Sequence, residues 1–244
     1  MNSLEHDRKI LQEAIDSSRN VVFFGGAGVS TESGIPDFRS KDGLYHQKYA
    51  YDPEEIISHH FYEQNKEEFF RFYRERMLVL DAKPNPCHLA LAELEKRGKL
   101  SAIVTQNIDG LHQKAGSKNV IELHGSIRRN YCEDCSRFYD GTFVKNCPTL
   151  VPRCPHCGGV IKPDVVLYEE SLDVHVMTKA MIAISEADLL IVAGTSLVVY
   201  PAASFLNYFQ GRELILIDRN PEKEDERADL VLHQNVGELF GGIR

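Results

Sequence analysis

Polar side chains follow two apolar runs of the chain, at the point where each run ends. The run LSAIVT is followed by Gln106, Asn107 and Asp109, and the run NVIEL is followed by His124. Apolar β-branched runs predict strands buried on both faces of a parallel sheet, whose carboxyl ends meet at the edge where ligands bind. An imidazole at this edge can accept a proton from a hydroxyl group near neutral pH. A lone histidine is more often a structural hydrogen-bond partner, but its polar neighbours favour His124 and Asn107 as catalytic residues.

Four of the six cysteines lie in two CxxC pairs. Cys132 and Cys135 form the first pair, Cys154 and Cys157 form the second, and eighteen residues separate the pairs. This spacing is typical of a site that binds one Zn²⁺ through four thiolates. Because sulfur then occupies every tetrahedral position, no position is open to a substrate, and we expect the zinc to be structural.

Other interpretations of the cysteines stay open at this point. The two pairs could be redox-active, and His156 inside the second pair could compete with a cysteine as a ligand. Cys87 and Cys147 have no partner at ligand spacing, so we expect them to be a core thiol and a surface thiol.

A turn of small residues follows the first apolar run, in the segment FFGGAGVSTESGIPDFRS. The small residues that match the start of a dinucleotide-binding fingerprint are Gly26, Ala27 and Gly28. Thr31 stands at the place of the third glycine, and such a turn lets backbone amides approach a pyrophosphate. Glycines also make tight turns without any ligand. The polar segment that follows favours nucleotide binding, and its candidate residues are Asp37, Phe38 and Arg39.

A second polar turn closes the apolar run DLLIVA, at Gly194, Thr195 and Ser196. Small and hydroxylic residues suit contact with a phosphate or a ribose, although the same residues can simply cap the next helix. We include all three among the candidate nucleotide contacts.

Six apolar runs recur along the chain, each closed by glycine or a polar cluster: NVVFFGGAG, LSAIVTQN, NVIELHG, DLLIVAGTS, ELILIDRN and DLVLHQN. Segments with helical apolar spacing lie between several of them, and this alternation predicts an α/β fold with a Rossmann-like doubly wound parallel sheet. Residues 40–83, which are charged and aromatic, and residues 126–163, which are rich in cysteine and proline, interrupt the alternation. We expect them to be a helical insertion with a cofactor loop and a zinc-binding insertion, which together form a smaller lobe. Residues 1–39, 84–125 and 164–244 would form the nucleotide-binding domain.

Charge and hydropathy argue against several partners. The 244 residues carry 28 basic and 36 acidic side chains, and this net charge of −8 argues against nucleic acid. No apolar stretch is long enough to span a membrane, and the charged first twenty residues lack the features of a signal peptide. We expect a monomeric, cytoplasmic protein whose cysteines are reduced or metal-bound.

Several motifs occur in the order found in one enzyme family. They are GAGVSTESGIPDFR, TQNIDGLH, ELHG, the paired CxxC segments, VVLYEE and GTSLVVYPA. In this combination, which covers nearly the whole chain, the sequence resembles the sirtuins, the NAD-dependent protein lysine deacylases, and especially their compact bacterial and archaeal members. The resemblance implies that NAD is a co-substrate, that zinc is structural, and that acetylated lysine of a protein or peptide is the substrate.

The resemblance also assigns roles to residues that match the family's motifs. It places contacts with the dinucleotide at Ala27, Thr31, Phe38, Arg39, Thr195, Ser196, Asp218 and Val236. It places the nicotinamide and its ribose at Gln106, Asn107, Ile108 and Asp109. His124 would be the general base, and Val166 and Tyr168 would line an apolar tunnel for the acylated lysine.

The chemistry that the resemblance implies passes the acyl group to the ribose of NAD. The acyl oxygen attacks the sugar carbon as nicotinamide leaves, which gives an alkylimidate. His124 deprotonates the ribose, whose 2′-oxygen attacks the imidate carbon, and water finally releases lysine and 2′-O-acetyl-ADP-ribose. Two alternatives use parts of the same motifs: a mono-ADP-ribosyltransferase and a non-catalytic module that binds NAD and zinc. His124 and Asn107 together disfavour the non-catalytic module, which would need neither residue.

Two positions depart from the family's usual residues. Asp218 stands where asparagine is usual, so both ribose hydroxyls can still donate to it, but its charge near a pyrophosphate is expected to affect affinity. Glu169 stands where glycine is usual, and we expect it to narrow or recharge the rim of the substrate cleft.

The preferred acyl group follows from two further positions. Family members that remove succinyl or malonyl groups carry a tyrosine and, three residues on, an arginine; Phe70 and Tyr73 stand at these positions here. Neither offers a cation to an acyl carboxylate, which is costly to bury unpaired. Arg71 and Arg74 are each one residue further on, a helical rotation of about 100°, and should point away.

We therefore expect acetyl-lysine to be preferred over succinyl-lysine by at least about 10²-fold in kcat/KM, which corresponds to about 2.7 kcal/mol. Steady-state kinetics on matched acetylated and succinylated peptides measure this ratio. Equal efficiencies would show that the assignment of Phe70 and Tyr73 is wrong.

Overall fold

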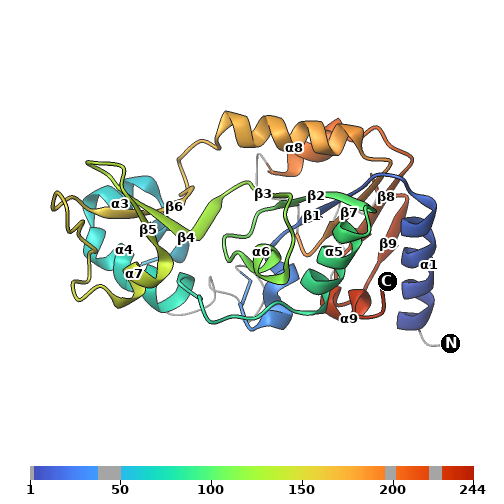
Figure 1. Cartoon of the computed structure of the whole chain (residues 1–244), viewed down its shortest axis with the longest axis horizontal. Coiled ribbons are helices and arrows are strands. Elements are labelled where there is room, and N and C mark those ends of the chain that lie inside the picture. Colours follow the sequence, from blue (N-terminus) through green and yellow to red (C-terminus); the bar gives the residue numbers. More distant parts are fainter. Residues whose placement is uncertain (1–2, 38–50, 196–201, 220–226) are drawn as a thin grey trace.

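A computed structural model of the chain describes residues 3–37, 51–195, 202–219 and 227–244. A six-stranded sheet with helices on both faces forms a larger lobe, and a three-stranded antiparallel sheet with short helices forms a smaller one (Figure 1). Among the described helices, none has the length and apolar character needed to cross a lipid bilayer.

The six apolar runs of the sequence form the large sheet. Its strands are β1 Val21–Gly25, β2 Leu100–Thr105, β3 Val120–Glu122, β7 Leu189–Ala193, β8 Glu213–Ile217 and β9 Leu230–Leu232. All neighbours are parallel, and the spatial order is β3-β2-β1-β7-β8-β9. This is the order of a doubly wound nucleotide-binding sheet, in which the direction of winding reverses between β1 and β7. The predicted Rossmann-like α/β fold is confirmed.

Alternate side chains of β1 enter the cores on the two faces of the sheet. Val21 and Phe23 belong to one core cluster, Val22 and Phe24 belong to the other, and all four are 0% exposed. The helices that contribute to the first cluster are α1 Ser3–Ser17, the 3-10 helix η1 Ala27–Ser33, α5 Pro86–Lys96 and α9 Val236–Phe240. The helices that contribute to the second are α8 Val174–Glu186 and η4 Ala202–Tyr208. The continuous apolar runs of the sequence follow from burial on both faces.

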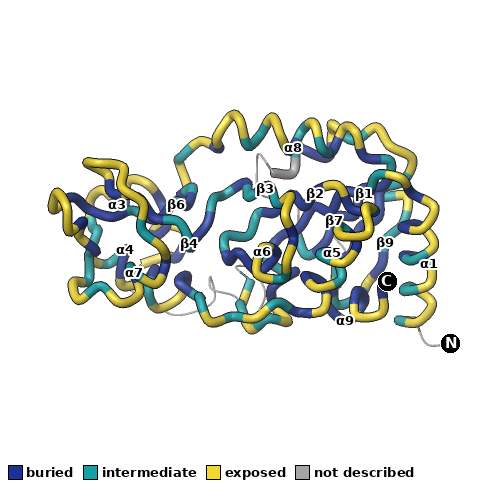
Figure 2. The backbone as a smooth tube through the Cα atoms, in the orientation of Figure 1, coloured by how far each residue is buried: buried dark blue, intermediate teal, exposed yellow. Residues whose placement is uncertain are grey.

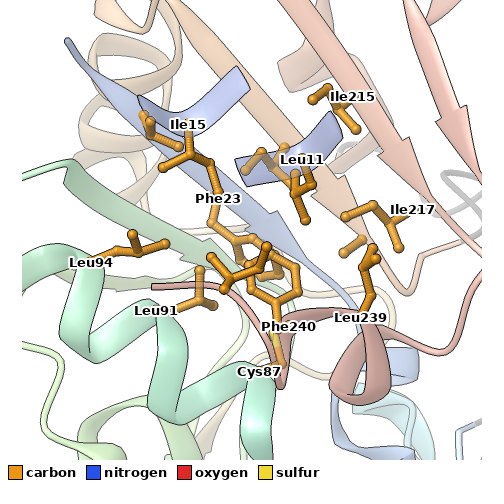
Figure 3. Packing of buried hydrophobic residues seen from close by; sticks show 14 of the residues in the cluster. Leu11, Ile15, Phe23, Cys87, Leu91, Leu94, Ile215, Ile217, Leu239 and Phe240 are labelled. Atoms are coloured by element: carbon orange, nitrogen blue, oxygen red, sulfur yellow. The ribbon is translucent and has the colours of Figure 1, made fainter. Parts of the chain in front are cut away.

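Phe23 lies in the middle of the first cluster (Figure 3). Its ring packs edge to face on Phe240 of α9, with ring centroids 5.7 Å apart. Cys87 of α5 belongs to the same cluster and is 0% exposed, as expected for a core thiol. Cys147 is a half-buried free thiol.

The smaller lobe has its own apolar core. Its strands are β4 Gly125–Cys132, β5 Phe138–Asp140 and β6 Ile161–Val165, in the spatial order β5-β4-β6. Its helices are α2 Pro53–Ile56, α3 His59–Gln64, α4 Lys66–Phe72, the π-helical turn η3 Tyr73–Met77, and α7 Gly141–Asn146. Buried aromatic side chains of α3, α4 and η3 pack on residues of β4 and β6 to form this core. Figure 2 shows buried backbone segments in both lobes and exposed residues along the outer sides of α1 and α8.

An ion-pair triad links the two sheets beside the segment that joins β3 to β4. Arg129 Nη1 donates to Glu122 Oε2 at 2.6 Å, and Arg129 Nε donates to Asp164 Oδ2 at 2.7 Å. Glu122 ends β3 in the large sheet, whereas Arg129 and Asp164 belong to β4 and β6. His124 lies on the short connection between the two strands.

Candidate functional site

The carboxyl ends of β1 and β7 touch through their backbones. A Cβ atom on Gly28 would lie 2.7 Å from the Cα of Gly194, and a Cβ on Gly194, whose φ is +61°, would lie 2.5 Å from Val29 N. Gly28 N donates to Gly194 O at 2.8 Å, and Gly26 N donates to Ala193 O at 3.0 Å. Side chains are thus excluded at Gly28 and Gly194. The two turns meet where the winding of the sheet reverses and where open α/β sheets bind their ligands.

The turn after β1 continues as the 3-10 helix η1 Ala27–Ser33. Thr31 is exposed on this helix, and its hydroxyl donates to Gly28 O at 3.0 Å. The amides of Gly26 and Gly28 are bonded to the β7 strand and turn. These two glycines therefore allow close backbone approach, and their amides are engaged within the protein.

Asn107, Ser30 and Asp109 form one hydrogen-bond network beside this turn. The side-chain nitrogen Nδ2 of Asn107 donates to Gly26 O at 3.0 Å and to Ser30 Oγ at 3.1 Å. Ser30 Oγ donates to Asp109 Oδ2 at 2.7 Å, and the backbone nitrogen of Leu111 donates to Asp109 Oδ1 at 2.8 Å. Asp109 is 5% exposed. The network fixes an amide and a carboxylate at the end of β2, next to the glycine turn.

Two residues of this network were missed in the sequence. Ser30 lies inside the motif GAGVS, and its hydroxyl was the only local signal. Arg128 lies in β4, and its Nε donates to Asp109 O at 3.0 Å. Gly110 has a φ of +71°, and a Cβ added there would lie only 2.6 Å from that Nε. A glycine is therefore required at this position both by the backbone conformation and by the packing of Arg128. No local pattern could have paired residues from different sheets.

Gln106 joins the ends of three neighbouring strands. Its backbone nitrogen donates to Gly25 O of β1 at 2.9 Å, and its Nε2 donates to Thr195 Oγ1, beyond β7, at 3.0 Å. Its carbonyl oxygen accepts from His124 Nδ1 at 2.9 Å. The predicted residues Gln106, Thr195 and His124 thus lie together.

The bond to Gln106 decides which nitrogen of His124 can act as a base. A carbonyl oxygen can only accept, so Nδ1 carries the proton, and in the neutral ring Nε2 holds the free lone pair. Burial lowers the pKa of His124, and the hydrogen bond to Gln106 offsets part of this effect. The imidazole is therefore neutral at pH 7, which is the state that a general base needs.

The remaining predicted residues lie in several elements. Val166 N donates to His124 O at 3.1 Å, which places Val166 next to the candidate base, and Tyr168 follows in the same loop. Val236 is buried at the start of α9, where Gly237 N donates to a carboxylate oxygen of Glu32 in η1. The other described candidates are Ala27 at the start of η1, Asp37 after it, Ile108 beside the smaller core, and Asp218 after β8. Phe38, Arg39 and Ser196 lie outside the described residues.

Two buried histidines, His88 and His112, lie close to each other, and His88 also interacts with Asp109. His88 closes a capping box at the start of α5, where its Nδ1 accepts from Asn85 N at 3.2 Å. Its ring centroid is 4.7 Å from that of His112 in helix α6 Leu111–Ala115. Neither nitrogen of His112, nor Nε2 of His88, has a hydrogen-bond partner among the described residues. Burial lowers the pKa of His88 to about 4, although Asp109 raises it, and burial also lowers the pKa of His112.

The four paired cysteines come together at the end of β4. Their sulfur atoms all lie within 4.8 Å of one another, with Cys132 and Cys157 at 3.3 Å and Cys135 and Cys154 at 3.7 Å. Four thiolates on one Zn²⁺ at about 2.3 Å would be about 3.8 Å apart, so the cluster fits a tetrahedral site. Figure 1 places β4, which ends at Cys132, with β5 and β6 in the smaller lobe, away from the large sheet.

Local geometry shapes each cysteine pair. Ser136 and Gly158, which directly follow the two pairs, have φ values of +56° and +82°, and their amides turn back to bond Cys132 O and Cys154 O. Tyr139 OH lies 2.9 Å from Cys154 Sγ. His156 is exposed and is not one of the clustered groups, so the four cysteines are the ligands that the geometry favours.

Proteins of one known family share both the sequence motifs and the fold of this chain. The model of the Sir2 family matches residues 26–201. The chain belongs to the Sir2 family. It is 55% identical over 238 residues to a protein of Clostridium tetani named NAD-dependent protein deacetylase, covering 97% of this chain and 96% of that protein. A protein of Clostridium perfringens with the same name is 57% identical over 236 residues, covering 96% of each chain.

Solved Sir2 structures have the same fold. One, described as "Sir2-p53 peptide-NAD+", superposes with a TM-score of 0.83 at 38% identity and covers 95% of both chains. Another, described as "Sir2 bound to acetylated peptide", also gives a TM-score of 0.83, at 37% identity, and covers 95% of this chain and 94% of that one. The large sheet with its smaller lobe is thus the Sir2 arrangement.

If the cysteine cluster holds zinc, removal of one ligand should loosen the smaller lobe first. We expect one zinc per wild-type chain by metal analysis, and loss of zinc and of activity in Cys154→Ala, because metal binding and folding of the lobe are coupled. Amide hydrogen exchange should show that β4–β6 lose protection before β1 and β7. Cys147→Ala, which removes a thiol outside the cluster, is the matched control and should retain the metal. Active wild-type protein without zinc would contradict the assignment.

The buried histidines predict acid sensitivity. His88, His112 and His124 all have a folded pKa below the ordinary 6.5, so below that pH the unfolded chain binds more protons than the folded chain. The free energy of unfolding should therefore fall as pH decreases from about 6.5 towards about 4, by on the order of 2 kcal/mol for His88 alone. Urea unfolding between pH 7.5 and 5 measures it.

The variant His88→Gln separates this effect from general acid denaturation. Glutamine at this position can keep the capping box but does not titrate. Its stability should depend less on pH than that of the wild type over the same range. Equal losses in the two proteins would show that His88 is not responsible.

Proposed function

We propose that this chain is an NAD-dependent protein lysine deacetylase, which releases nicotinamide, 2′-O-acetyl-ADP-ribose and deacetylated lysine. The observation that carries the proposal is the state of His124. Its Nδ1 is held by Gln106 O at 2.9 Å and its pKa is lowered, so Nε2 is a neutral base at the ligand-binding edge of the sheet. The names of the similar clostridial proteins support the same activity.

The residues around His124 suit the nicotinamide, the adjoining ribose and the pyrophosphate of NAD. Both donor hydrogens of Asn107 are directed to Gly26 O and Ser30 Oγ, so its carbonyl oxygen is the group suited to accept from a ribose hydroxyl. Asp109 is a nearly buried carboxylate whose remaining lone pairs can accept from a nicotinamide carboxamide. The glycines at the contact of the β1 and β7 turns would let a pyrophosphate approach the backbone there.

Nicotinamide leaves NAD as a neutral ring, so orientation and exclusion of water matter more for this step than an acid catalyst. The base is needed afterwards, when the ribose 2′-hydroxyl attacks the carbon of the transferred acyl group. His124 Nε2 takes that proton. Gln106 O then stabilises the imidazolium through the hydrogen that it accepts from Nδ1.

The acylated lysine would enter beside Val166 and Tyr168, the second of which is 37% exposed. Phe70 and Tyr73 are both 0% exposed within the smaller core. Arg71 Nε bonds Glu68 Oε2 at 3.2 Å, and Arg74 donates to the carbonyl oxygens of Cys147 and Thr149. The cations that flank these positions are thus engaged elsewhere, which supports acetyl over anionic acyl groups.

Zinc, held by Cys132, Cys135, Cys154 and Cys157, completes the proposal as a structural ion. Four thiolates leave no position for a substrate, so the metal would hold the smaller lobe and take no part in the chemistry. Acetylated proteins or peptides are the proposed partners. The absence of a nucleic-acid partner, the monomeric state and the cytoplasmic location stay predictions. So do the residue limits of the nucleotide-binding domain and of its two insertions.

Release of nicotinamide with and without an acetylated peptide tests the proposed reaction. We expect release that depends on the peptide, together with formation of 2′-O-acetyl-ADP-ribose. Labelling of protein by ADP-ribose without a peptide would favour mono-ADP-ribosyl transfer. No release in either case would favour a non-catalytic module and would contradict the proposal.

Replacement of the candidate base provides a sharper prediction. His124→Tyr should lower deacetylated product formation by roughly 10²-fold or more, because it removes the proposed acceptor of the ribose proton, while NAD still binds. Calorimetric titration with NAD checks the second part. His175→Tyr on the exposed side of α8 is the control and should behave as the wild type. Near-normal turnover by His124→Tyr would place the base elsewhere.

A further inference from the structure

The loop of residues 166–170, which follows β6, is fastened to the start of α3. Tyr168 N donates to Ile57 O at 3.0 Å, and His59 N donates to Tyr168 O at 3.0 Å. These two bonds make an isolated parallel bridge between Ser58 and Tyr168. The loop is therefore attached to the helical part of the smaller lobe, although at Val166 its backbone is bonded to His124 O.

Two histidine–carboxylate contacts reinforce this attachment. Glu169 accepts from His60 twice, from the backbone nitrogen at 3.0 Å and from Nδ1 at 2.7 Å. Glu170 Oε1 lies 3.0 Å from His59 Nδ1. An ionised carboxylate can only accept, so Nδ1 carries a hydrogen in both rings.

Glu170 is also bonded within its own loop and to β6. Its Oε2 accepts from Leu167 N at 2.8 Å, and its Oε1 lies 3.3 Å from Lys162 Nζ. Glu170 therefore braces the loop from inside, whereas Glu169 has its described side-chain contacts across the gap to α3. The contact between Glu169 and His60 is half-exposed on both sides, which limits its strength.

The backbone at Glu169 is in a conformation that disfavours a side chain. Its φ is +74°, and only one other described non-glycine residue, Ser136, has a positive φ. The left-handed conformation costs a non-glycine residue about 1 kcal/mol, and glycine would adopt it without this cost. The contacts of the carboxylate with His60, which also lower the pKa of Glu169, offset the strain. The sequence predicted that Glu169 alters the rim of the substrate cleft, and in the structure its carboxylate is bonded to His60 of α3.

We propose that Glu169 is a positioning residue for the acylated-lysine substrate, which acts by holding the loop of Val166 and Tyr168 against α3 before the peptide binds. This inference rests on the proposed function, because it assumes that Val166 and Tyr168 line the lysine site. The loop joins His124, through Val166 N, to the helical part of the smaller lobe, through Tyr168. Loss of the Glu169 contact should therefore weaken peptide binding and leave NAD binding unchanged.

Steady-state kinetics of three variants test the proposal. In Glu169→Gly, the KM for an acetylated peptide should rise about fivefold, as expected for loss of a half-exposed charged contact, while the KM for NAD changes by less than about twofold. Glu169→Gln keeps one acceptor oxygen for His60 and should lose less. His60→Ala removes the side-chain donor but keeps the backbone amide that bonds Glu169, so it should raise the peptide KM, by less than Glu169→Gly does.

The double variant tests whether the two residues act through one contact. Combining His60→Ala with Glu169→Gly should raise the peptide KM no further than Glu169→Gly alone, because Glu169→Gly already removes both bonds to residue 60. The melting temperature of Glu169→Gly should stay close to that of the wild type, because relief of the left-handed strain offsets loss of the contacts with His60. A variant with a lower melting temperature and equal losses in both KM values would indicate general destabilisation and would overturn the proposal.

Amide hydrogen exchange provides a readout that needs no catalysis. The amides of Tyr168 and His59 should exchange about fivefold faster in His60→Ala than in the wild type, because their bridge is less supported. If the wild type does not deacetylate the peptide, the proposed function fails, and this measurement alone decides whether Glu169 holds the loop. Unchanged exchange in His60→Ala, or an unchanged peptide KM in an active Glu169→Gly enzyme, would overturn the inference.

Discussion

The contact between two glycine turns at the reversal of the sheet is the constraint on which the site depends. Gly28 and Gly194 approach so closely that a Cβ on either would overlap the backbone of the other turn. This approach requires β1 and β7 to be neighbours, because their carboxyl ends must lie side by side. A side chain at either glycine would separate the two strand ends and with them the polar groups that depend on them.

The polar network is built outward from this contact. Gly26 O, presented by the turn, accepts from Asn107, and Gly25 O accepts from the backbone of Gln106. These bonds fix the end of β2 against the end of β1, and Gln106 in turn fixes the tautomer of His124. The candidate base is thus positioned by backbone atoms of the sheet, which are less mobile than side chains. Burial then keeps its imidazole neutral, so orientation and protonation state have a common structural origin.

The smaller lobe is attached to this edge at several independent places. Arg129 pairs with Glu122 and Asp164, Arg128 donates to Asp109 O, and Val166 N donates to His124 O. The bonds to Glu122, Asp109 and His124 cross to the large sheet at the candidate site or beside it, and the bond to Asp164 holds Arg129 within the smaller lobe. The cysteine cluster lies at the far end of β4 and would act on the site only through the strands that these bonds hold. Through these strands, a metal with no open ligand position would still affect the candidate site.

The sequence by itself determined the features that depend on local spacing. Burial on both faces of the sheet requires continuous apolar runs, so the six strands could be recognised, and the paired CxxC spacing was sufficient to bring four sulfurs together. The rule that parallel strands present their carboxyl ends at one edge predicted that Gln106 and His124 would lie together. The tertiary structure alone decided that Ser30 bonds Asp109, that Arg128 reaches Asp109 O, and that Glu169 turns to His60. These contacts join residues 79, 19 and 109 positions apart, and they depend on strand order and on the packing of one lobe against the other, which periodicity along the chain does not encode.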